Sequence, residues 1–260
     1  MKKLIALLSI FAFVVLAMPV SAATPLAQIN SGDLIRGTTF NAVYYMGEDG
    51  MRYVFPNDKA YFTWYNNFDT VKWLTDADLA KVQIGGNVTY RPGVRMVKIN
   101  SDPKTYAVGA GGSLEWVTSE AVAVALYGSN WNQKIDDVPD AFFGNYKKGS
   151  EINTAGDFDP ASETANASDI NEDKNLQEPI VVTISNSTYS PSSLTIAKGR
   201  AVKFVNNSSG KHTATAEDLS WGTGTLNNGE AFIRYFKTVG EFGYFDSYNP
   251  SSIMGAITVN

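Results

Sequence analysis

The sequence predicts two folded parts of different class: an α+β region with an internal duplication, followed by an all-β Greek-key sandwich. Three observations lead to this prediction. Glycine-containing turns followed by helix-capping residues recur 62 positions apart, at Gly47 and at Gly109. A polar, acidic stretch then interrupts the apolar pattern. After it come short apolar stretches separated by Gly, Pro, Asn and Ser, which are typical of strands and turns.

The first 22 residues have the pattern of a secretory signal peptide. Lys2 and Lys3 precede an apolar run from Leu4 to Val15, and Val20-Ser21-Ala22 places small residues at a cleavage position. An uncleaved membrane anchor is the alternative, but the run is short for a bilayer span. We therefore expect an exported protein, periplasmic, extracellular or on the cell surface, with no membrane span after cleavage.

Composition excludes several classes of function. The sequence contains no cysteine, which rules out disulfides, cysteine nucleophiles, zinc-thiolate sites and copper thiolates. The net charge of −5 and the pI near 5.0 give no broad basic surface for nucleic acid or anionic lipid.

Residues 32–152 contain one unit twice. In each copy a glycine turn joins two short apolar stretches, and a polar residue suited to N-capping follows, so each copy predicts a hairpin and then a helix. A second short helix is expected in each copy, because carboxylates follow Thr75 and Pro139. The matching features of the two copies are the turns Gly47–Gly50 and Gly109–Gly112 and the capping residues Asn57 and Ser119.

This duplicated region resembles a tandem module of secreted and cell-surface proteins from uncultured bacterial lineages. The resemblance implies a location at the cell surface, and it implies no particular activity. It rests on the phrases Arg52-Tyr53-Val54-Phe55-Pro56-Asn57, Gly85-Gly86-Asn87-Val88-Thr89-Tyr90-Arg91-Pro92-Gly93, Tyr127-Gly128-Ser129-Asn130-Trp131 and Val138-Pro139-Asp140-Ala141-Phe142-Phe143.

Aromatic residues crowd the first copy and have two interpretations. Core packing is their usual role, and stacking against a glycan or an envelope protein is the other. A catalytic carboxylate pair drawn from Glu48, Asp49, Asp58 and Asp69 would make a carbohydrate-active enzyme, but their spacing follows turns and helix caps. The crowded aromatics are Tyr44, Tyr45, Tyr53, Phe55, Tyr61, Phe62, Trp64, Tyr65, Phe68 and Trp73.

Residues 153–178 form an acidic segment with no regular hydrophobic period. Seven carboxylates stand against Lys174, and Phe158 is a notable apolar exception. A segment of this composition buries too little apolar surface to offset the conformational entropy lost on folding, so we expect an extended, flexible linker. A cation-binding role for its carboxylates is the alternative.

Residues 179–260 predict a small β-sandwich, because short alternating stretches recur between turns. The strand candidates are 180–184, 193–196, 201–205, 232–236, 242–245 and 256–259.

The order of phrases in this segment resembles a plastocyanin- or amicyanin-type cupredoxin. The resemblance implies a copper-binding fold whose first histidine is His212, with a closing loop that supplies a cysteine, a second histidine and an axial methionine. It rests on Tyr189-Ser190-Pro191, Leu194-Thr195-Ile196, Lys198-Gly199, Phe204-Val205-Asn206-Asn207, Lys211-His212-Thr213-Ala214, Trp221-Gly222-Thr223-Gly224-Thr225-Leu226 and Met254-Gly255-Ala256-Ile257-Thr258-Val259.

In this sequence the copper positions are degenerate. The resemblance places Asp246 at the cysteine position, Asn249 at the second histidine position and Met254 at the methionine position. A blue-copper site needs a thiolate and two imidazoles, so no type 1 site and no tightly bound cofactor is expected. We expect Asp246 and Asn249 to stabilise the loop through backbone N–H groups, and Met254 to pack. A weak copper(II) site from His212 and Asp246 is the alternative.

These observations predict a non-enzymatic exported binding or structural protein of the cell envelope, with an envelope protein or a glycan as partner. A metal-binding cupredoxin for storage or delivery is the second hypothesis. A carbohydrate-binding or carbohydrate-active first domain is the third.

Overall fold

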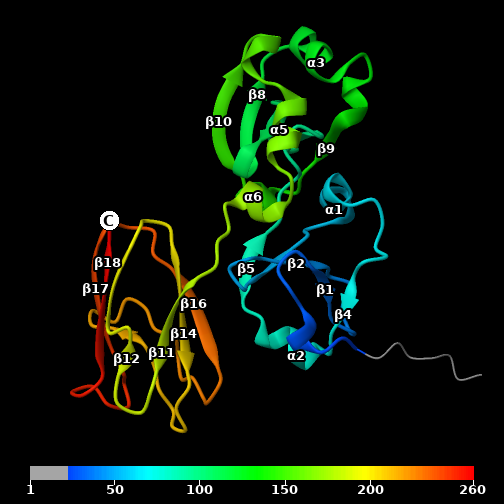
Figure 1. The fold of residues 1–260 in the computed structure, drawn as a ribbon. Helices are drawn as coiled ribbons and strands as arrows, with labels where there is room; N and C mark the ends of the chain where they lie inside the picture. The colour runs from blue at the N-terminus through cyan, green and yellow to red at the C-terminus, as the bar shows by residue number, and fades with distance from the viewer. Residues whose placement is uncertain (1–22) are drawn as a thin grey trace, which may run out of the picture.

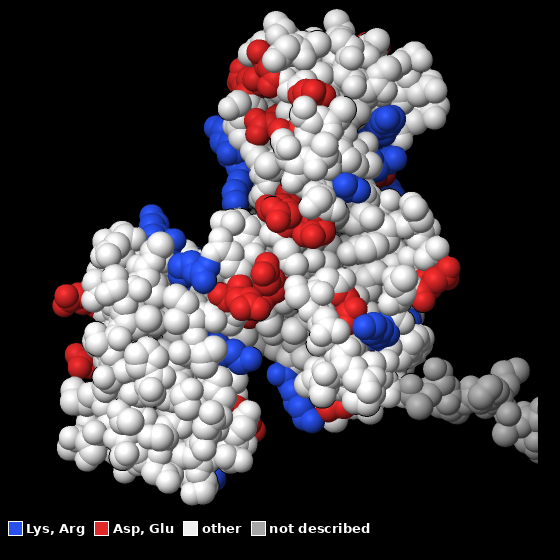
Figure 2. Space-filling view, viewed as in Figure 1, with Lys and Arg blue, Asp and Glu red and all other residues white. Residues whose placement is uncertain are grey.

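The computed structural model describes residues 23–260, and the predicted signal peptide lies outside the described residues. Figure 1 shows two α+β units, drawn in blue to green, and a β-sandwich drawn in yellow to red. Within residues 23–260 no helix is both long and apolar enough to cross a bilayer. Acidic and basic side chains are interspersed on the face shown in Figure 2.

The first unit follows a short 3₁₀ turn at Leu26–Gln28 and is built on a five-stranded sheet of order β4-β1-β2-β3-β5. Strands β1, β2 and β3 are antiparallel, whereas β4 pairs parallel with β1 and β5 parallel with β3. Its elements are β1 (Leu34–Arg36), β2 (Tyr44–Met46), β3 (Arg52–Val54), α1 (Asp58–Trp64), β4 (Lys72–Trp73), α2 (Asp76–Lys81) and β5 (Ile84–Asn87).

The second unit repeats this plan with the order β9-β6-β7-β8-β10. The outer strands are again the parallel ones, β9 beside β6 and β10 beside β8. Its elements are β6 (Met96–Lys98), β7 (Tyr106–Gly109), η2 (Ala110–Gly112), β8 (Ser113–Val117), α3 (Glu120–Tyr127), η3 (Trp131–Lys134), β9 (Ile135–Asp137), α4 (Asp140–Phe143) and β10 (Lys147–Ile152).

The shared strand order confirms the predicted internal duplication. The local signals that led to it are present: the Asn57 side chain accepts from the backbone N–H of Ala60 (2.8 Å), and Ser119 accepts from that of Val122 (3.4 Å). Both residues cap the helix that follows the hairpin, because their side-chain oxygens satisfy N–H groups that have no partner within the helix.

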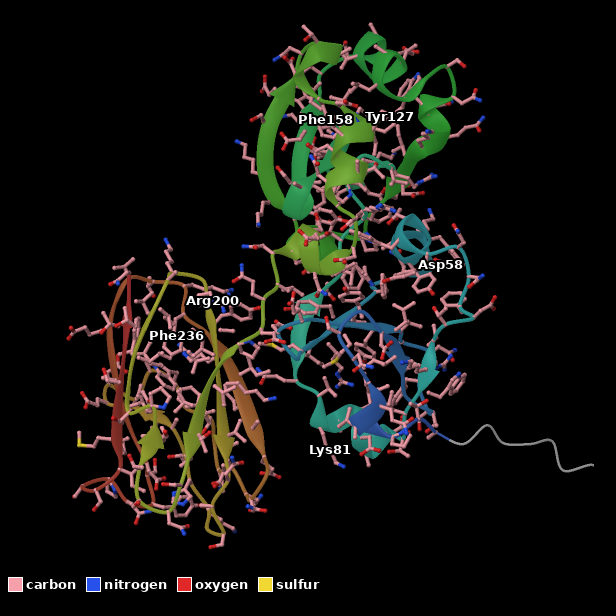
Figure 3. All side chains as sticks on the ribbon, viewed as in Figure 1. Asp58, Lys81, Tyr127, Phe158, Arg200 and Phe236 are labelled. Carbon is pink, nitrogen blue, oxygen red and sulfur yellow. The ribbon has the colours of Figure 1, made fainter. Side chains whose placement is uncertain are left out.

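The structure corrects the prediction of an extended linker at residues 153–178, a segment that we call the acidic strap. The acidic strap contains η4 (Ala155–Asp157), α5 (Pro160–Asn166) and α6 (Ile170–Lys174). Phe158 is buried in the core of the second unit, beside Tyr127 (Figure 3), whereas Ile170 and Leu176 are buried with the first unit. These apolar residues are too irregularly spaced to show a period, so composition alone gives the wrong expectation.

Hydrogen bonds explain how so acidic a segment folds. Asp159 and Asp169 cap α5 and α6, and Asp157 accepts from the backbone N–H groups of Asn153 and Thr154. Two more carboxylates hold the hairpin turn of the second unit: Glu163 accepts from the N–H of Ala110 and Asp173 from that of Gly111, both at 2.8 Å. The strap therefore ties the two units together.

Residues 179–260 form two four-stranded sheets of order β12-β11-β14-β16 and β13-β18-β17-β15. Their inward side chains form one core that includes Phe204, Trp221, Phe236 and Tyr244. The predicted sandwich and its six strands are confirmed, and β12 and β15, with two residues each, are additional. The strands are β11 (Ile180–Ile184), β12 (Tyr189–Ser190), β13 (Ser193–Ile196), β14 (Ala201–Asn206), β15 (Thr215–Ala216), β16 (Ala231–Tyr235), β17 (Gly240–Phe245) and β18 (Met254–Val259).

The sandwich docks onto the first unit through β16, the edge strand of its sheet. The Gln83 side chain donates to the carbonyl of Ile233 (2.9 Å) and accepts from its N–H (3.0 Å), so it covers the edge of that strand. Ala201 and Ile233 share a buried cluster with side chains of the first unit. The hydroxyl of Tyr235 donates to Asp49 (2.7 Å).

The aromatic residues of the first unit differ in burial. Phe62, Phe68 and Trp73 are exposed, whereas Tyr45, Tyr53, Phe55 and Tyr61 are buried. The four carboxylates considered for catalysis lie in separate local settings: Glu48 and Asp49 in the turn between β2 and β3, Asp58 in the first turn of α1, and Asp69 in the turn before β4.

Candidate functional site

Three of the four degenerate copper positions come together where two loops of the sandwich meet. His212 follows β14 and forms an isolated antiparallel bridge with Leu226. Asp246 directly follows β17, and Asn249 lies in the loop that leads to β18. The fold thus brings His212 and Asp246 into contact across 34 residues of sequence.

Asn206, the last residue of β14, fixes the loop that presents His212. Its buried side-chain amide donates to the carbonyls of Gly210 (2.8 Å) and Leu226 (2.7 Å), and its oxygen accepts from the N–H of Ser208 (2.9 Å). Sequence reasoning did not single out Asn206. An asparagine at the end of a strand, ahead of a Ser- and Gly-rich loop, is the signal that would have found it.

The His212 ring and the Asp246 carboxylate form a buried pair. Nδ1 of His212 lies 2.8 Å from Oδ2 of Asp246, and the two side chains are 4% and 0% exposed. Oδ2 also accepts from the side-chain amide of Asn249 (2.9 Å). Oδ1 accepts from the backbone N–H groups of Thr213 (2.9 Å) and Tyr248 (3.2 Å). Four donors therefore use the full acceptor capacity of the carboxylate.

These contacts set the protonation state of the pair. Burial by itself raises the pKa of Asp246, but hydrogen bonds from Asn249, His212, Thr213 and Tyr248 outweigh it and hold that pKa below its usual range. The carboxylate is therefore ionised at neutral pH and accepts from every neighbour. Nδ1 of His212 must then carry a proton, because a carboxylate without a proton cannot donate.

Side-chain hydroxyls link the same two loops beside the pair. Oγ1 of Thr213 accepts from the N–H of Ser247 (2.8 Å) and donates to its hydroxyl (3.1 Å), and Thr215 lies 2.9 Å from that hydroxyl. Sequence reasoning missed these residues, since Ser and Thr in loops give no distinctive signal. The network holds Asp246 against the His212 loop without any metal ligand.

Met254 does not pack in the core, contrary to the expectation from the sequence. It is the first residue of β18 and is 54% exposed, in a surface hollow that Glu217 and Glu241 also line. The preceding residue, Ile253, is 1% exposed, and its carbonyl accepts from the N–H of Asp246 (3.0 Å). The chain therefore turns Ile253 into the core, and Met254 lies away from His212. Asn249 also differs from expectation, because its side chain donates to Asp246 and not to the backbone.

The residues present do not fit a type 1 copper ion. That site requires a thiolate and two imidazoles in one plane, and this sequence has no cysteine and a single histidine. Nδ1 of His212 is directed at Asp246, whose carboxylate has no acceptor position left. In residues 23–260 no group of three or more His, Asp or Glu side chains is placed to hold a metal ion.

Comparison with known proteins finds a match for the C-terminal part of the chain. Residues 160–259 match the family model described as Cupredoxin-like domain. A purple cupredoxin from Nitrosopumilus maritimus is 26% identical, with 31% of this chain and 99% of that chain covered and a TM-score of 0.29. No curated protein matches the sequence.

Two further solved structures are similar to a part of this chain. A copper-containing nitrite reductase from Thermus scotoductus is 28% identical, with 32% of this chain and 23% of that chain covered and a TM-score of 0.31. An oxidised mutant of amicyanin is 21% identical, with 31% of this chain and 81% of that chain covered and a TM-score of 0.30. The fold of residues 179–260 is assigned from the family match together with the sheet order.

Proposed function

We propose that this chain, whose C-terminal part is a cupredoxin-like domain, is an exported, non-enzymatic binding or structural protein of the cell envelope. In this proposal the cupredoxin-like domain is a scaffold without a functional type 1 copper site. The observation that carries the proposal is the state of Asp246, the residue that the sequence resemblance aligns with the copper cysteine: its carboxylate accepts four hydrogen bonds, one of them from His212.

The chemistry of the His212–Asp246 pair supports this reading. A protonated Nδ1 that donates to a carboxylate has no lone pair to give to a metal. Copper binding through Nδ1 would require the loss of that proton and of this buried hydrogen bond, and a hydrogen bond to a charged group is worth about 1.5–3 kcal/mol. A hydrogen-bonded pair therefore replaces the metal as the link between the two loops.

The interface of the sandwich with the first unit supports a scaffold role. Gln83 pairs with the edge of β16, and Tyr235 reaches the buried Asp49 of the first unit. These contacts hold the sandwich against the duplicated region. Export is supported by the signal-like pattern of residues 1–22, and the expected partner is an envelope component.

A second candidate function, metal storage or delivery, has one observation in its favour. His212 and Asn249 each lie within hydrogen-bond distance of Asp246, and nitrogen and oxygen donors suit copper(II). Such a site would use His212 with Asp246 after the Nδ1 proton leaves. It would be weak, because it offers a single imidazole.

A copper titration monitored by electron paramagnetic resonance separates the two candidates. We expect no stoichiometric copper(II) binding at micromolar protein and no visible charge-transfer band. Binding at one ion per chain that is lost in His212→Ala would overturn the proposal and establish the metal-binding function. Glu172→Gln, in the exposed acidic strap, is the matched control, because copper bound nonspecifically to surface carboxylates would respond to it and not to His212→Ala.

A further inference from the structure

Each unit of the duplicated region contains a cavity at the same place, between the end of its third strand and the start of its first α-helix. The cavity of the first unit measures about 460 Å³ and that of the second about 360 Å³, both within the range of ligand pockets. Corresponding residues line the two, as shown by the pairs Val54 and Trp116, Asn57 and Ser119, and Asp58 and Glu120, each 62 positions apart.

The first cavity is partly filled by aromatic side chains of its own unit. Tyr61 of α1 stacks on Phe68 with ring centroids 4.3 Å apart, and it also meets the edge of Phe55 at 5.0 Å. Phe142, from α4 of the second unit, lines the same cavity. The lining of this cavity is mainly apolar, and the cavity lies where a helix of the second unit meets the first unit.

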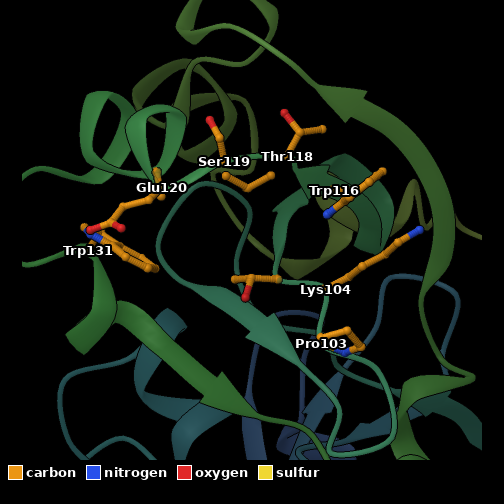
Figure 4. A pocket seen from close by; sticks show the side chains of 10 residues that line it. Pro103, Lys104, Trp116, Thr118, Ser119, Glu120 and Trp131 are labelled. Atoms are coloured by element: carbon orange, nitrogen blue, oxygen red, sulfur yellow. The ribbon is translucent and has the colours of Figure 1, made fainter.

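The second cavity has a different set of lining side chains. Ala123 takes the position of Tyr61 and leaves the floor open, while Trp131 lies one residue beyond the position that corresponds to Phe68. Figure 4 shows Trp116 and Trp131 on opposite sides of the cavity, with Lys104 beside Trp116 and Glu120 beside Trp131. The two copies of the unit therefore differ at this place. The cavity of the first copy lies against stacked aromatic side chains, whereas the cavity of the second is lined by two indole rings and two charged groups.

The two charged groups of this cavity, Glu120 and Lys104, form no ion pair within the described residues. The Nζ atom of Lys104 lies 4.0 Å from the ring centroid of Trp116. The Glu120 carboxylate and the Lys104 ammonium group are therefore free of ion pairs within residues 23–260, and Lys104 covers one face of the Trp116 ring.

A third cavity extends the site beyond Trp116. It measures about 430 Å³, and Lys104 and Trp116 line it as well as the second cavity. Tyr106, Phe143 and Lys148 are among its other lining residues. The Trp116–Lys104 pair therefore stands between two adjoining hollows, which suits a chain of several similar groups better than one small molecule.

We propose that these two hollows of the second unit form a binding site for an oligosaccharide. The apolar face of a sugar ring stacks on an indole, and its hydroxyls are donors and acceptors for Glu120 and Lys104. Trp and Tyr combine a large apolar face with a polar edge, which is the combination that a sugar requires. This inference rests on the proposed envelope-binding function and names the ligand class and the site.

Titration calorimetry with a panel of hexasaccharides tests the site. The panel contains hexamers of glucose, N-acetylglucosamine, mannose and galacturonic acid. We expect at least one to bind, and Trp116→Ala and Trp131→Ala each to weaken that binding by about tenfold or more, as truncation of a central aromatic contact does. Ala123→Tyr, which introduces the residue of the first unit, should block binding by filling the cavity.

The matched control is Phe68→Ala, which truncates an aromatic residue that lines the cavity of the first unit and should leave oligosaccharide binding unchanged. Binding of no panel member, or binding unaffected by Trp116→Ala and Trp131→Ala, overturns the inference. Co-sedimentation with cell envelopes of the producing organism distinguishes failure of the oligosaccharide site from failure of the proposed function. Envelope binding that Trp116→Ala leaves intact removes only the oligosaccharide site, whereas absence of any envelope binding removes the proposed function.

Discussion

The carboxylate of Asp49 and the hydroxyl of Tyr235 lie 2.7 Å apart although 186 residues separate them in sequence. Asp49 is fully buried, and the same oxygen accepts from Tyr53 at 2.6 Å. One carboxylate of the first unit is therefore bound jointly by a tyrosine of its own sheet and a tyrosine of the sandwich. This contact makes the docking of the two parts specific.

Tyr235→Phe should weaken the contact between the first unit and the sandwich. The change removes one hydrogen bond to a charged group, worth about 1.5–3 kcal/mol. Urea unfolding should show this loss, with the sandwich unfolding at lower denaturant than in the unmodified protein. Tyr248→Phe is the control, since Tyr248 is exposed and contacts only Thr225 through its hydroxyl. Equal stability of the two variants would contradict the role given to Tyr235.

Asp246→Asn should destabilise the sandwich strongly. The substitution places an amide where His212, Asn249, Thr213 and Tyr248 all donate, so at least one buried donor loses its acceptor. A buried donor left without its acceptor costs about 1–3 kcal/mol, and the loss is larger where the acceptor was charged. Thermal unfolding measures the effect, and Asp218→Asn, at an exposed turn, should change stability little. A fully stable Asp246→Asn protein would show that the pair does not hold the loops.

The double variant Asp246→Cys/Asn249→His should bind copper and become coloured. It restores a thiolate and a second imidazole at positions whose backbone already lies beside His212, and the axial methionine contributes only weakly in such sites. Absorption and electron paramagnetic resonance spectra should show a thiolate-to-copper transition. His212→Ala in the same background should abolish it, and Asp246→Cys alone should give a weaker complex. A colourless double variant would mean that the loops no longer approach a copper-binding geometry.

Asp173→Asn should raise stability at neutral pH. Asp173 is 9% exposed, and its Oδ2 atom has no hydrogen-bond partner among the described residues. Burial is the main cause that raises the pKa of this carboxyl group. A raised folded-state pKa favours the folded protein at acidic pH, and this contribution is lost as the pH rises through that pKa. The gain from Asp173→Asn should therefore shrink toward about pH 4, the ordinary pKa of an aspartate.

Chemical denaturation at several pH values measures this dependence. Asp69→Asn, which makes the same substitution at an exposed turn, is the control. If Asp173→Asn is less stable than the unmodified protein at every pH, the hydrogen bond from Gly111 outweighs the cost of the buried charge.

Ile170→Ala should release the acidic strap. The side chain is fully buried between the strap and the first unit, and truncating a buried isoleucine costs about 2–5 kcal/mol. Limited proteolysis should then cut within residues 153–178 at a faster rate than in the unmodified protein. Val181→Ala, at an exposed position in β11, is the control. Equal cleavage rates would restore the view of this segment as a flexible linker.

The amino-acid sequence by itself determined the local features of this protein. The capping residues Asn57 and Ser119 and the glycine turns before them indicate the repeated unit, because caps and turns depend on neighbours a few residues away. The alternating stretches after residue 179 indicate the sandwich for the same reason. The lack of cysteine excludes a copper thiolate whatever the fold.

Only the tertiary structure decided which side chains meet. The approach of Asp246 to His212, the choice of Ile253 over Met254 for the core, and the folding of the acidic strap all depend on burial against distant segments. The pairing of Trp116 with Trp131 around one cavity does so as well. Contacts between distant segments give no periodic pattern in the sequence. The residues next to a side chain in the sequence do not determine which distant residue it meets.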